Sequence, residues 1–545
     1  MNIEPADYVI IGAGASGAVV ANRLSADPAV RVVLLEAGPR ADGFWNRMPS
    51  GGLTRMNKPD ADWMYKTEPD PSLGGREMVW NAGRMLGGGS AINGMVYIRG
   101  DRRDYDQWAG ELGCTGWSWN EVLPYFLKSE NWQGAPSQTH GSHGPLAVAE
   151  ARMQHPLAET FIDACEQFGL RRVPDYCAGD VDGAFRNLTT QDNGTRASTA
   201  RAFLDEAEKR PNLQVVTGAL ADRVVIENGC ATGVVALVGG ERVKIAARRE
   251  VVVSGGTLHS PAILMRSGIG PAQELAKHGI DLVRDLPEVG QNLHEHISFS
   301  QSFEVDVPTW NNLFGKVSLA REMLKYVFAR RGLMTMIPVE AMAYLRTRPE
   351  LDFPDVKLSL GLMMFDPVKS GPSDKPGMVV FQNVAKPKSR GEVRLRSADP
   401  EDKPVIAPQL VGHPDDLAAM IAGARMVREI FAQPALAKHV VRQVMPDPIP
   451  QTDEELTESI KTRSGIGFHP VATCRMGGDE ASVVDPRLRV RGIEGLRVID
   501  ASIMPIMPAA NTNAPSIMVG EKGAAMILED ARVLLKPAPA SPVHR

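Results

Sequence analysis

Three glycines near the N-terminus constrain the fold of this 545-residue chain more than any other feature. Gly12, Gly14 and Gly17 follow the apolar run 8–11, and a helix is predicted to begin near Ala15. Glycines at these positions permit a tight turn, the approach of a ligand to the backbone, and close packing of a helix against the preceding strand. The free N–H groups at the start of such a helix attract phosphate groups. The pattern therefore predicts a strand, a turn and a helix that bind a dinucleotide.

A second apolar run over 32–35 is closed by Glu36, at the distance from the glycines that dinucleotide-binding folds require. A carboxylate there accepts hydrogen bonds from both ribose hydroxyls of an adenosine, and it repels a phosphate at the 2' position. NAD and FAD carry the same adenosine diphosphate. The start of the chain therefore leaves the choice between them open.

A second glycine-rich stretch covers residues 83–94. It has too many glycines for a helix interior and too few polar residues for a free linker. This composition is typical of backbone that lies against a flat ligand, and the alternative is a flexible loop.

Composition narrows the class of protein. A chain of this length usually divides into about two to four domains. The net charge of −5, without a basic block, gives no footprint for nucleic acid or an anionic membrane. The five cysteines are scattered with no C-x-x-C pair, which argues against a structural metal.

No run approaches the roughly twenty apolar residues of a membrane-spanning helix. The first strand is predicted to begin near Asp7, which leaves no room for a leader. We therefore expect a cytoplasmic protein without an integral membrane segment.

Later segments predict further parts of a parallel sheet. Residues 250–253 are typical of a buried strand, and Ser260 with Pro261 predicts the N-cap and first position of the helix that follows. Residues 496–500 predict another strand, and a helix is predicted over 513–528.

Between about 300 and 465 the pattern changes to shorter alternating runs, such as 356–360 and 391–396. Alternation of this kind favours half-buried antiparallel strands. We expect a second domain inserted between pieces of the first.

An ordered series of motifs extends over almost the whole chain. It consists of the opening glycines with Glu36, then 83–100, 117–119, 122–126, 255–270, 289–293 with His296, 387–391, 469–477, 500–505 and 511–515. In this series the chain resembles the glucose-methanol-choline family of FAD-dependent oxidoreductases.

The resemblance implies an α/β fold, with a Rossmann-like FAD-binding domain and an interleaved α+β substrate domain built on an antiparallel sheet. The expected FAD-binding domain is discontinuous, over 1–155, 200–300 and 465–535. The expected substrate-binding domain covers 156–199 and 301–464. Residues 536–545 are expected to form a disordered tail.

The glycine motifs and the resemblance together assign a set of positions to FAD. These are Gly12, Gly14, Ala15, Ser16, Gly17, Glu36, Ala37, Arg84, Gly88, Gly89, Ser90, Asn93, Gly94, Met95, Val96, Ala221, Asp500, Ala501, Thr512 and Asn513. Some relatives attach the flavin covalently through a histidine just before the asparagine of the second glycine stretch. Ile92 occupies that place here, so we expect non-covalent FAD.

The resemblance places the reaction at two residues. Hydride leaves an alcohol carbon readily only when a base removes the hydroxyl proton, and a histidine with a pKa near 6.5 is a suitable base. His469 matches the base of the family, and Asn511 matches its partner. Because an amide is not a base at neutral pH, we assign proton removal to His469 and orientation of the substrate oxygen to Asn511. Asn513 is expected to cap a helix whose dipole favours the reduced flavin anion.

Other reactive residue types are expected to be structural. His259, His294 and His296 are interpreted in this way, with His296 satisfying a turn, and Cys474 is interpreted as packing.

Two methionine-rich segments, 333–337 and 363–365, lie where the family places substrate-facing residues. A stripe of core residues is the favoured interpretation of either segment. If they line the site, an apolar, aryl or furanic primary alcohol fits better than a sugar or choline.

The leading hypothesis is an FAD-dependent alcohol oxidase or dehydrogenase that uses oxygen or a quinone as electron acceptor. An alternative is a lyase or photodecarboxylase that holds flavin on the same fold. A reductase that uses both NAD and FAD is disfavoured because no second complete glycine motif follows a strand, and a non-catalytic flavin scaffold would not need the His469 and Asn511 pair. Oligomerisation remains open.

Overall fold

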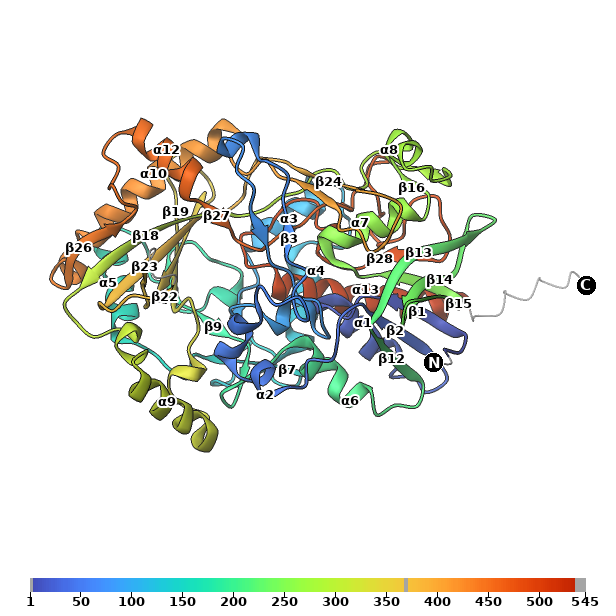
Figure 1. Cartoon of the computed structure of the whole chain (residues 1–545), viewed down its shortest axis with the longest axis horizontal. Helices are drawn as coiled ribbons and strands as arrows, with labels where there is room; N and C mark the ends of the chain where they lie inside the picture. The colour runs from blue at the N-terminus through green and yellow to red at the C-terminus, as the bar shows by residue number, and fades with distance from the viewer. Residues whose placement is uncertain (1–2, 367–370, 535–545) are drawn as a thin grey trace, which may run out of the picture.

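The computed structural model describes residues 3–366 and 371–534, and the tail predicted over 536–545 lies outside them. Two seven-stranded sheets lie toward opposite ends of the long axis of the molecule (Figure 1). The elements between the two sheets form the site described below.

The first sheet is mainly parallel and contains the glycine turn. Its order is β12 (Leu213–Thr217), β2 (Val32–Glu36), β1 (Ala6–Ile11), β15 (Glu241–Val253), β14 (Cys230–Val238) and β13 (Ala219–Glu227), with β28 (Leu496–Val498) beside the end of β15. The pairs that join β12, β2, β1, β15 and β28 are parallel. β13, β14 and the first half of β15 form an antiparallel ribbon.

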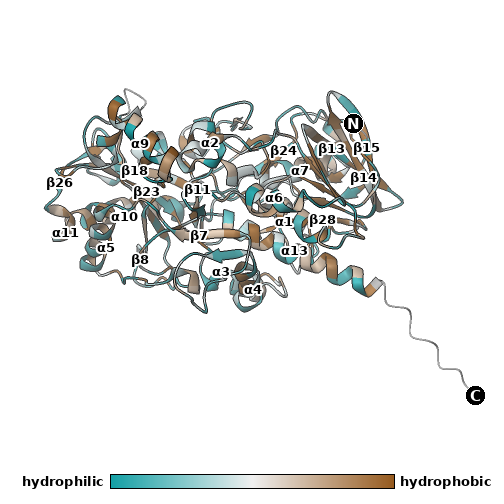
Figure 2. Ribbon diagram, turned by 90° about the horizontal axis from the view of Figure 1, so that it is seen from below, coloured by the Kyte–Doolittle hydropathy of each residue, from teal (hydrophilic) through white to brown (hydrophobic). Residues whose placement is uncertain are grey.

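Three helices follow strands of this sheet: α1 (Ala15–Leu24) follows β1, α7 (Gly256–Arg266) follows β15, and α13 (Asn513–Leu534) comes after β28. α1 packs against α13 so closely that a Cβ atom at Gly520 would lie 2.9 Å from the carbonyl oxygen of Ser16. Figure 2 shows stretches of hydrophobic residues, in brown, along α13. The predicted strand, turn and helix order at the N-terminus is confirmed.

The predicted start of the helix after β15 is wrong. α7 begins at Gly256, so that Ser260 and Pro261 lie inside it. A proline inside a helix leaves the carbonyl four residues earlier without its N–H donor. Here the hydroxyl of Thr473 donates to the carbonyl oxygen of Thr257 at 2.6 Å, which satisfies that carbonyl. The Ser260 hydroxyl donates to Asp500 at 2.5 Å and caps nothing.

The second sheet is antiparallel throughout. Its order is β26 (Val440–Met445), β18 (Ile297–Val305), β23 (Gly377–Val384), β20 (Val356–Gly361), β19 (Ala341–Leu345) and β8 (Ala184–Arg186), with β27 (Gly465–Ile466) beside β18. The two sheets together confirm the predicted fold class. The expectation of half-buried strands is wrong for β20, which is buried at every residue. One face of β20 packs in the core, and its polar residues face a cavity instead of solvent.

The remaining helices are α2 (Phe44–Arg47), α3 (Arg102–Gly110), α4 (Trp119–Ser129), α5 (Pro156–Phe168), α6 (Asp205–Ala207), α8 (Ala272–Lys277), α9 (Lys316–Ala329), α10 (Pro414–Phe431), α11 (Pro434–Ala437) and α12 (Asp453–Arg463). A four-stranded sheet joins β5 (Val96–Tyr97), β9 (Leu188–Thr189), β7 (Leu146–Glu150) and β6 (Glu130–Trp132). Two-stranded pairs are β3 (Tyr65–Lys66) with β4 (Val79–Trp80), β10 (Gln191–Asp192) with β11 (Thr195–Arg196), β16 (Ile269–Gly270) with β17 (Arg284–Asp285), β21 (Phe365–Asp366) with β22 (Gly371–Pro372), and β24 (Glu392–Arg394) with β25 (Val405–Ala407).

Each large sheet has its own hydrophobic core. The core of the first sheet is built around β1, β2, β15, α1 and α13, and the core of the second around β18, β20, β23, α5 and α10. Among the helices within residues 3–366 and 371–534, none combines the length and hydropathy needed to cross a membrane.

Candidate active site

A cavity of about 560 Å³ lies where the carboxyl ends of β1 and β2 meet the second sheet. Its walls come from the turn after β1, the glycine-rich stretch, the start of α7, strands β18, β20 and β23, and segments 466–470 and 511–516. Parallel α/β sheets bind ligands at this edge.

Most residues predicted to form the site line this cavity. They are Gly12, Gly14, Ala15, Ser16, Glu36, Ala37, Gly88, Gly89, Ser90, Asn93, Gly94, Met95, Val96, Ala221, Asp500, Ala501, Thr512 and Asn513, together with His469 and Asn511. Segments that are distant in the sequence therefore line the same cavity.

Gly17 and Arg84 do not line the cavity. A Cβ atom at Gly17 would lie 1.9 Å from the carbonyl oxygen of Gly12, so Gly17 serves the packing of α1 against the turn. The guanidinium of Arg84 lies over the ring of Trp63, 4.9 Å from its centroid. Its Nε is buried and has no hydrogen-bond partner in the part of the chain that the structure describes.

The two glycine turns form the cradle for a dinucleotide. Gly12 has a φ of +94°, and a Cβ atom at Gly88 would lie 2.9 Å from the Cα of Gly14, so the turns touch. Cβ atoms at Gly14 and Gly89 would instead project into open space. Gly14 caps α1 without a side-chain hydrogen bond, which leaves the first N–H groups of the helix for a ligand.

The carboxylate of Glu36 is held in place at this end of the cavity. It accepts hydrogen bonds from the backbone N–H of Ala13 at 3.0 Å and of Gly38 at 2.8 Å. Burial raises the pKa of Glu36 to about 7. A carboxylate has about four acceptor positions, so two remain for the hydroxyls of a ribose.

His469 lies at the other end, in the segment after β27. Its backbone N–H donates to both carboxylate oxygens of Glu295 at 2.9 Å. Its ring Nδ1 lies 3.0 Å from Nδ1 of His296, whose Nε2 lies 3.1 Å from the carbonyl oxygen of Ala385. The expectation that His296 satisfies a turn is therefore wrong, because His296 contacts the ring of His469.

These contacts select one tautomer of His469. A carbonyl oxygen only accepts, so Nε2 of His296 carries the hydrogen and its Nδ1 is an acceptor when the ring is neutral. Burial lowers the pKa of His296 well below its usual range, which keeps that ring neutral. Nδ1 of His469 must then carry a hydrogen and donate to His296. The lone pair of His469 is left on Nε2, where it can act as a base.

Lys357 of β20 completes the reactive end. Its ammonium nitrogen lies 3.4 Å from the side-chain oxygen of Asn511, and Lys357 lines the cavity while 1% exposed. Because lysine only donates, the Asn511 oxygen faces Lys357 and its amide nitrogen is available to a substrate oxygen. Burial, and then the charge of Lys357, lower the pKa of His469 well below its usual range.

Sequence reasoning missed Lys357. A lysine between Val356 and Leu358 is typical of a strand with one solvated face. The one signal in the sequence is that this strand belongs to the expected substrate-binding domain, where a polar face can line a ligand site instead of facing solvent.

The aromatic part of the wall was also missed. Trp63, Tyr65, Trp80 and His259 line the cavity, and the rings of Trp63 and His259 lie 4.2 Å apart. The segments 333–337 and 363–365 contribute nothing to this wall. Leu333, Met334 and Met336 are buried in the second core, as the favoured interpretation had it.

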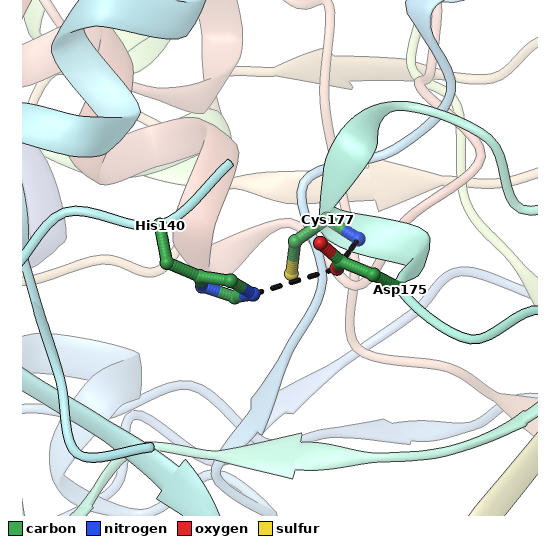
Figure 3. A group of neighbouring side chains, drawn as sticks. All are labelled: His140, Asp175 and Cys177. Atoms are coloured by element: carbon green, nitrogen blue, oxygen red, sulfur yellow. Dashed lines mark hydrogen bonds and ion pairs between the residues drawn. The ribbon is translucent and has the colours of Figure 1, made fainter. Parts of the chain in front are cut away.

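A separate cluster of His140, Asp175 and Cys177 has ligand atoms close enough for a metal ion (Figure 3). The ring of His140 contacts Asp175 at 3.4 Å and Glu130 at 2.9 Å. Burial lowers its pKa, but these two carboxylates outweigh burial and raise the pKa of His140 to about 9. Burial also raises the pKa of the Cys177 thiol. A protonated imidazole and thiol are poor ligands, and we interpret the cluster as an ion-pair network.

Comparison with known proteins agrees with this geometry. Family models described as GMC oxidoreductase match residues 6–298 and 387–520. An alcohol dehydrogenase (acceptor) from Pseudomonas putida is 40% identical over 534 residues, which are 96% of this chain and 95% of the relative. An oxygen-dependent choline dehydrogenase from Brucella anthropi is 39% identical over 529 residues, with the same coverage of 96% and 95%.

Solved structures show the same fold. Pyridoxine 4-oxidase from Mesorbium loti superposes with a TM-score of 0.87 at 28% identity, over 96% of this chain and 99% of that one. A formate oxidase variant from Aspergillus oryzae superposes with a TM-score of 0.90 at 28% identity, over 98% of this chain and 100% of that one.

Proposed function

The chain belongs to the GMC oxidoreductase family, and on that premise we propose that it oxidises a primary alcohol to the aldehyde with His469 as the base. The motif resemblance is thereby confirmed, and the protein is an FAD-dependent oxidoreductase acting on alcohols. The observation that carries the proposal is the ring of His469 on the cavity wall, with Nδ1 committed to His296 and Nε2 free.

His469 and Asn511 have different roles in the proposed reaction. FAD, when bound, supplies the acceptor for the hydride of the alcohol carbon. His469 Nε2 removes the hydroxyl proton, and the amide nitrogen of Asn511 donates to the same oxygen and fixes its position. General base catalysis of this kind contributes about a hundredfold to ten-thousandfold.

The cradle of glycine turns supports FAD as the cofactor, and we propose that it is held without a covalent bond. Ile92 lines the cavity beside Asn93 and offers no nucleophile. Acid precipitation of the holoenzyme should leave the flavin in the supernatant. Flavin that stays with the precipitated protein would refute this part of the proposal.

Phe381 of β23, Ile466 of β27 and Phe468, the neighbour of His469, line the cavity and support a substrate with an aromatic or other flat apolar part, such as an aryl or furanic alcohol. Anaerobic mixing of the holoenzyme with such alcohols should bleach the flavin absorbance. His469→Ala should slow this bleaching by about a hundredfold or more while the protein keeps its FAD. Full-rate bleaching by the variant would remove His469 from the reaction.

The electron acceptor is oxygen or a quinone, and timed reoxidation in air against added quinone distinguishes them. Lyase or photodecarboxylase chemistry is not favoured, because two relatives that are 40% and 39% identical are named as an alcohol dehydrogenase and a choline dehydrogenase.

A further inference from the structure

Lys357 is a buried lysine whose nearest opposite charge, that of Glu295, acts on it only through space and without an ion pair. Within residues 3–366 and 371–534, the only hydrogen bond of its ammonium group is the 3.4 Å contact with Asn511. Among the described residues no carboxylate lies within ion-pair distance of it. Burial of an uncompensated charge is costly, so such a group is retained where a ligand supplies the opposite charge.

Polar side chains surround Lys357 on the same face of the sheet. Asn383 of β23 lies opposite Lys357 in the strand register, and Ser298 of β18 lies opposite Asn383. These three and Ser359 all line the cavity. Asn383 donates to the carbonyl oxygen of Ile297 at 2.8 Å, whereas the hydroxyls of Ser298 and Ser359 have no partner among the described side chains and backbone.

We propose that Lys357, with Ser298 and Ser359, forms a subsite for a carboxylate carried by the alcohol substrate. A cation and two free hydroxyls are a donor set for an anion, and each contact would be a charge-assisted hydrogen bond. The carboxylate is not consumed, so the reaction remains oxidation of the hydroxymethyl group. This inference rests on the proposed function and narrows its substrate to an aromatic primary alcohol that is also a carboxylic acid.

The electrostatics of the site agree with such a ligand. Burial lowers the pKa of Lys357 to about 7, so part of this side chain is uncharged at neutral pH. A bound carboxylate favours the ammonium form of Lys357 and offsets the free-energy cost of removing that charge from water.

The test compares 4-(hydroxymethyl)benzoate with its methyl ester in anaerobic flavin reduction by the holoenzyme. The wild-type protein should favour the carboxylate by about 10- to 100-fold in second-order rate constant. Lys357→Met should reduce this preference at least about tenfold. Lys357→Gln keeps a donor for Asn511 and should lose the preference equally, whereas Lys244→Met, at an exposed lysine of β15, should leave it unchanged.

Equal slowing of both substrates in Lys357→Met would overturn the inference, because Lys357 would then act on the reacting oxygen. A wild-type preference for the ester would also overturn it. If no alcohol bleaches the flavin, the proposed function fails, and binding of benzoate, followed through the flavin spectrum, still tests the subsite. Benzoate affinity that is the same in wild type and Lys357→Met would then refute the subsite.

A second observation concerns the surface of α9, which projects from the edge of the molecule in Figure 1. Val317, Leu324 and Phe328 recur at helical spacing and are 85%, 58% and 83% exposed. Glu322 and Tyr326, on the opposite face, are buried. The helix therefore turns an apolar stripe away from the protein.

The neighbourhood of the stripe is aromatic and basic. Trp45 of α2 is 48% exposed, and its neighbour Phe44 contacts Tyr326 of α9 with ring centroids 5.9 Å apart. Exposed cations flank the stripe, namely Lys316, Arg321, Lys325 and Arg331, and of these Lys325 and Arg321 share Glu322 as an ion-pair partner at 2.6 Å and 3.9 Å. The only carboxylate of α9 is the buried Glu322. The net charge of −5 of the whole chain concealed this local positive surface.

We infer that α9 and α2 lie on the surface of an anionic lipid bilayer. An apolar face with aromatic residues and flanking cations is the pattern of an interfacial helix. A second copy of the chain fits less well, since a two-fold contact through this face would bring like charges together. Leu53, in the segment that follows α2, lines the cavity and is 38% exposed, so the surface adjoins a route to the site.

Sedimentation of the holoenzyme with vesicles tests this inference. Vesicles that contain phosphatidylglycerol should bind the protein at least about tenfold more strongly than vesicles of phosphatidylcholine alone, and added salt should weaken the binding. The triple substitution Val317→Gln, Leu324→Gln and Phe328→Gln should abolish it. Leu282→Gln with Val283→Gln, at residues 51% and 47% exposed elsewhere, should not.

Absence of vesicle binding would overturn the inference. So would a dimer that the triple substitution dissociates, because a second copy would then be the occupant of this face.

Discussion

The contact between His296 and His469 is the smallest feature on which the reaction depends. Without an acceptor at Nδ1, the neutral ring of His469 can place its hydrogen on Nε2, where the base is needed. His296 is thus a positioning residue that touches neither alcohol nor cofactor in this proposal.

We predict that His296→Leu slows anaerobic flavin reduction by about 10- to 100-fold, because two tautomers then compete and the preferred orientation of the ring is lost. His296→Gln should retain most of the rate, since its amide can donate to Ala385 and its oxygen can accept from His469. Stopped-flow reduction measures both variants. Equal loss in the two would show that His296 acts through packing alone.

The response to acid follows from the lowered pKa of His469. A histidine with a pKa of 6.5 is about three quarters protonated at pH 6, and its base activity falls accordingly. Burial and the charge of Lys357 lower the pKa of His469, so its ring stays neutral as the pH falls. Flavin reduction by a neutral alcohol should therefore stay constant between about pH 7 and pH 6.

Lys357→Gln removes one of the two causes and should move the acid limb of this profile to higher pH. A wild-type rate that falls with an apparent pKa near 6.5 would contradict the prediction.

Residues of this site differ in how far the sequence reveals them. His469 and Asn511 sit in motifs, and the motifs reveal them because chain order and residue type are enough. Lys357 acquires its role only when β20 lies beside Asn511, and His296, just before β18, acquires its role only beside His469. In both contacts the two residues are more than a hundred positions apart. Nothing local in the sequence encodes these contacts.

At the scale of elements, the turn between β1 and α1 separates two uses of glycine. A methyl group at Gly17 would overlap the carbonyl of Gly12, whereas one at Gly14 would meet no protein atom within 4 Å. The first position serves helix packing, and the second serves the ligand.

Gly17→Ala should therefore destabilise the protein by about 3 kcal/mol or more, since the overlap forces α1 away from the sheet. Gly14→Ala should leave the melting temperature of the FAD-free protein nearly unchanged and weaken FAD binding. Thermal unfolding with and without FAD distinguishes the two variants. A Gly17→Ala protein as stable as wild type would show that the turn relaxes at little cost.

Elements with a regular hydrophobic pattern could be predicted from the sequence. Elements whose bounds depend on contacts with distant residues could not. The apolar runs of β1, β2 and the end of β15 predict buried strands from local sequence alone, and these segments are buried in the structure. The start of α7 was predicted too late because Pro261 normally marks a first turn, and the donor that permits it inside the helix comes from Thr473, in a distant segment.

For the whole molecule, the cavity is the joint between the two sheets. Gly14 and Glu36 reach it from the first sheet, Lys357 reaches it from the second, and Tyr344 of β19 also donates across to the carbonyl oxygen of Ala509 at 2.8 Å. A ligand that fills this cavity contacts both sheets, so its binding free energy stabilises the folded arrangement of the two sheets.

The melting temperature should accordingly depend on free FAD. A ligand that binds only the folded protein stabilises it by RT ln(1 + [L]/Kd), which is about 2.7 kcal/mol when its concentration is a hundred times Kd. Protein stripped of flavin should melt several degrees lower, and titration with FAD should restore the wild-type value along this logarithmic curve. Glu36→Gln, which loses the charge that faces the ribose, should shift the curve to higher FAD concentration. A melting temperature that does not change with added FAD would contradict the prediction. It would show that the ligand contributes nothing to the stability of the two sheets together.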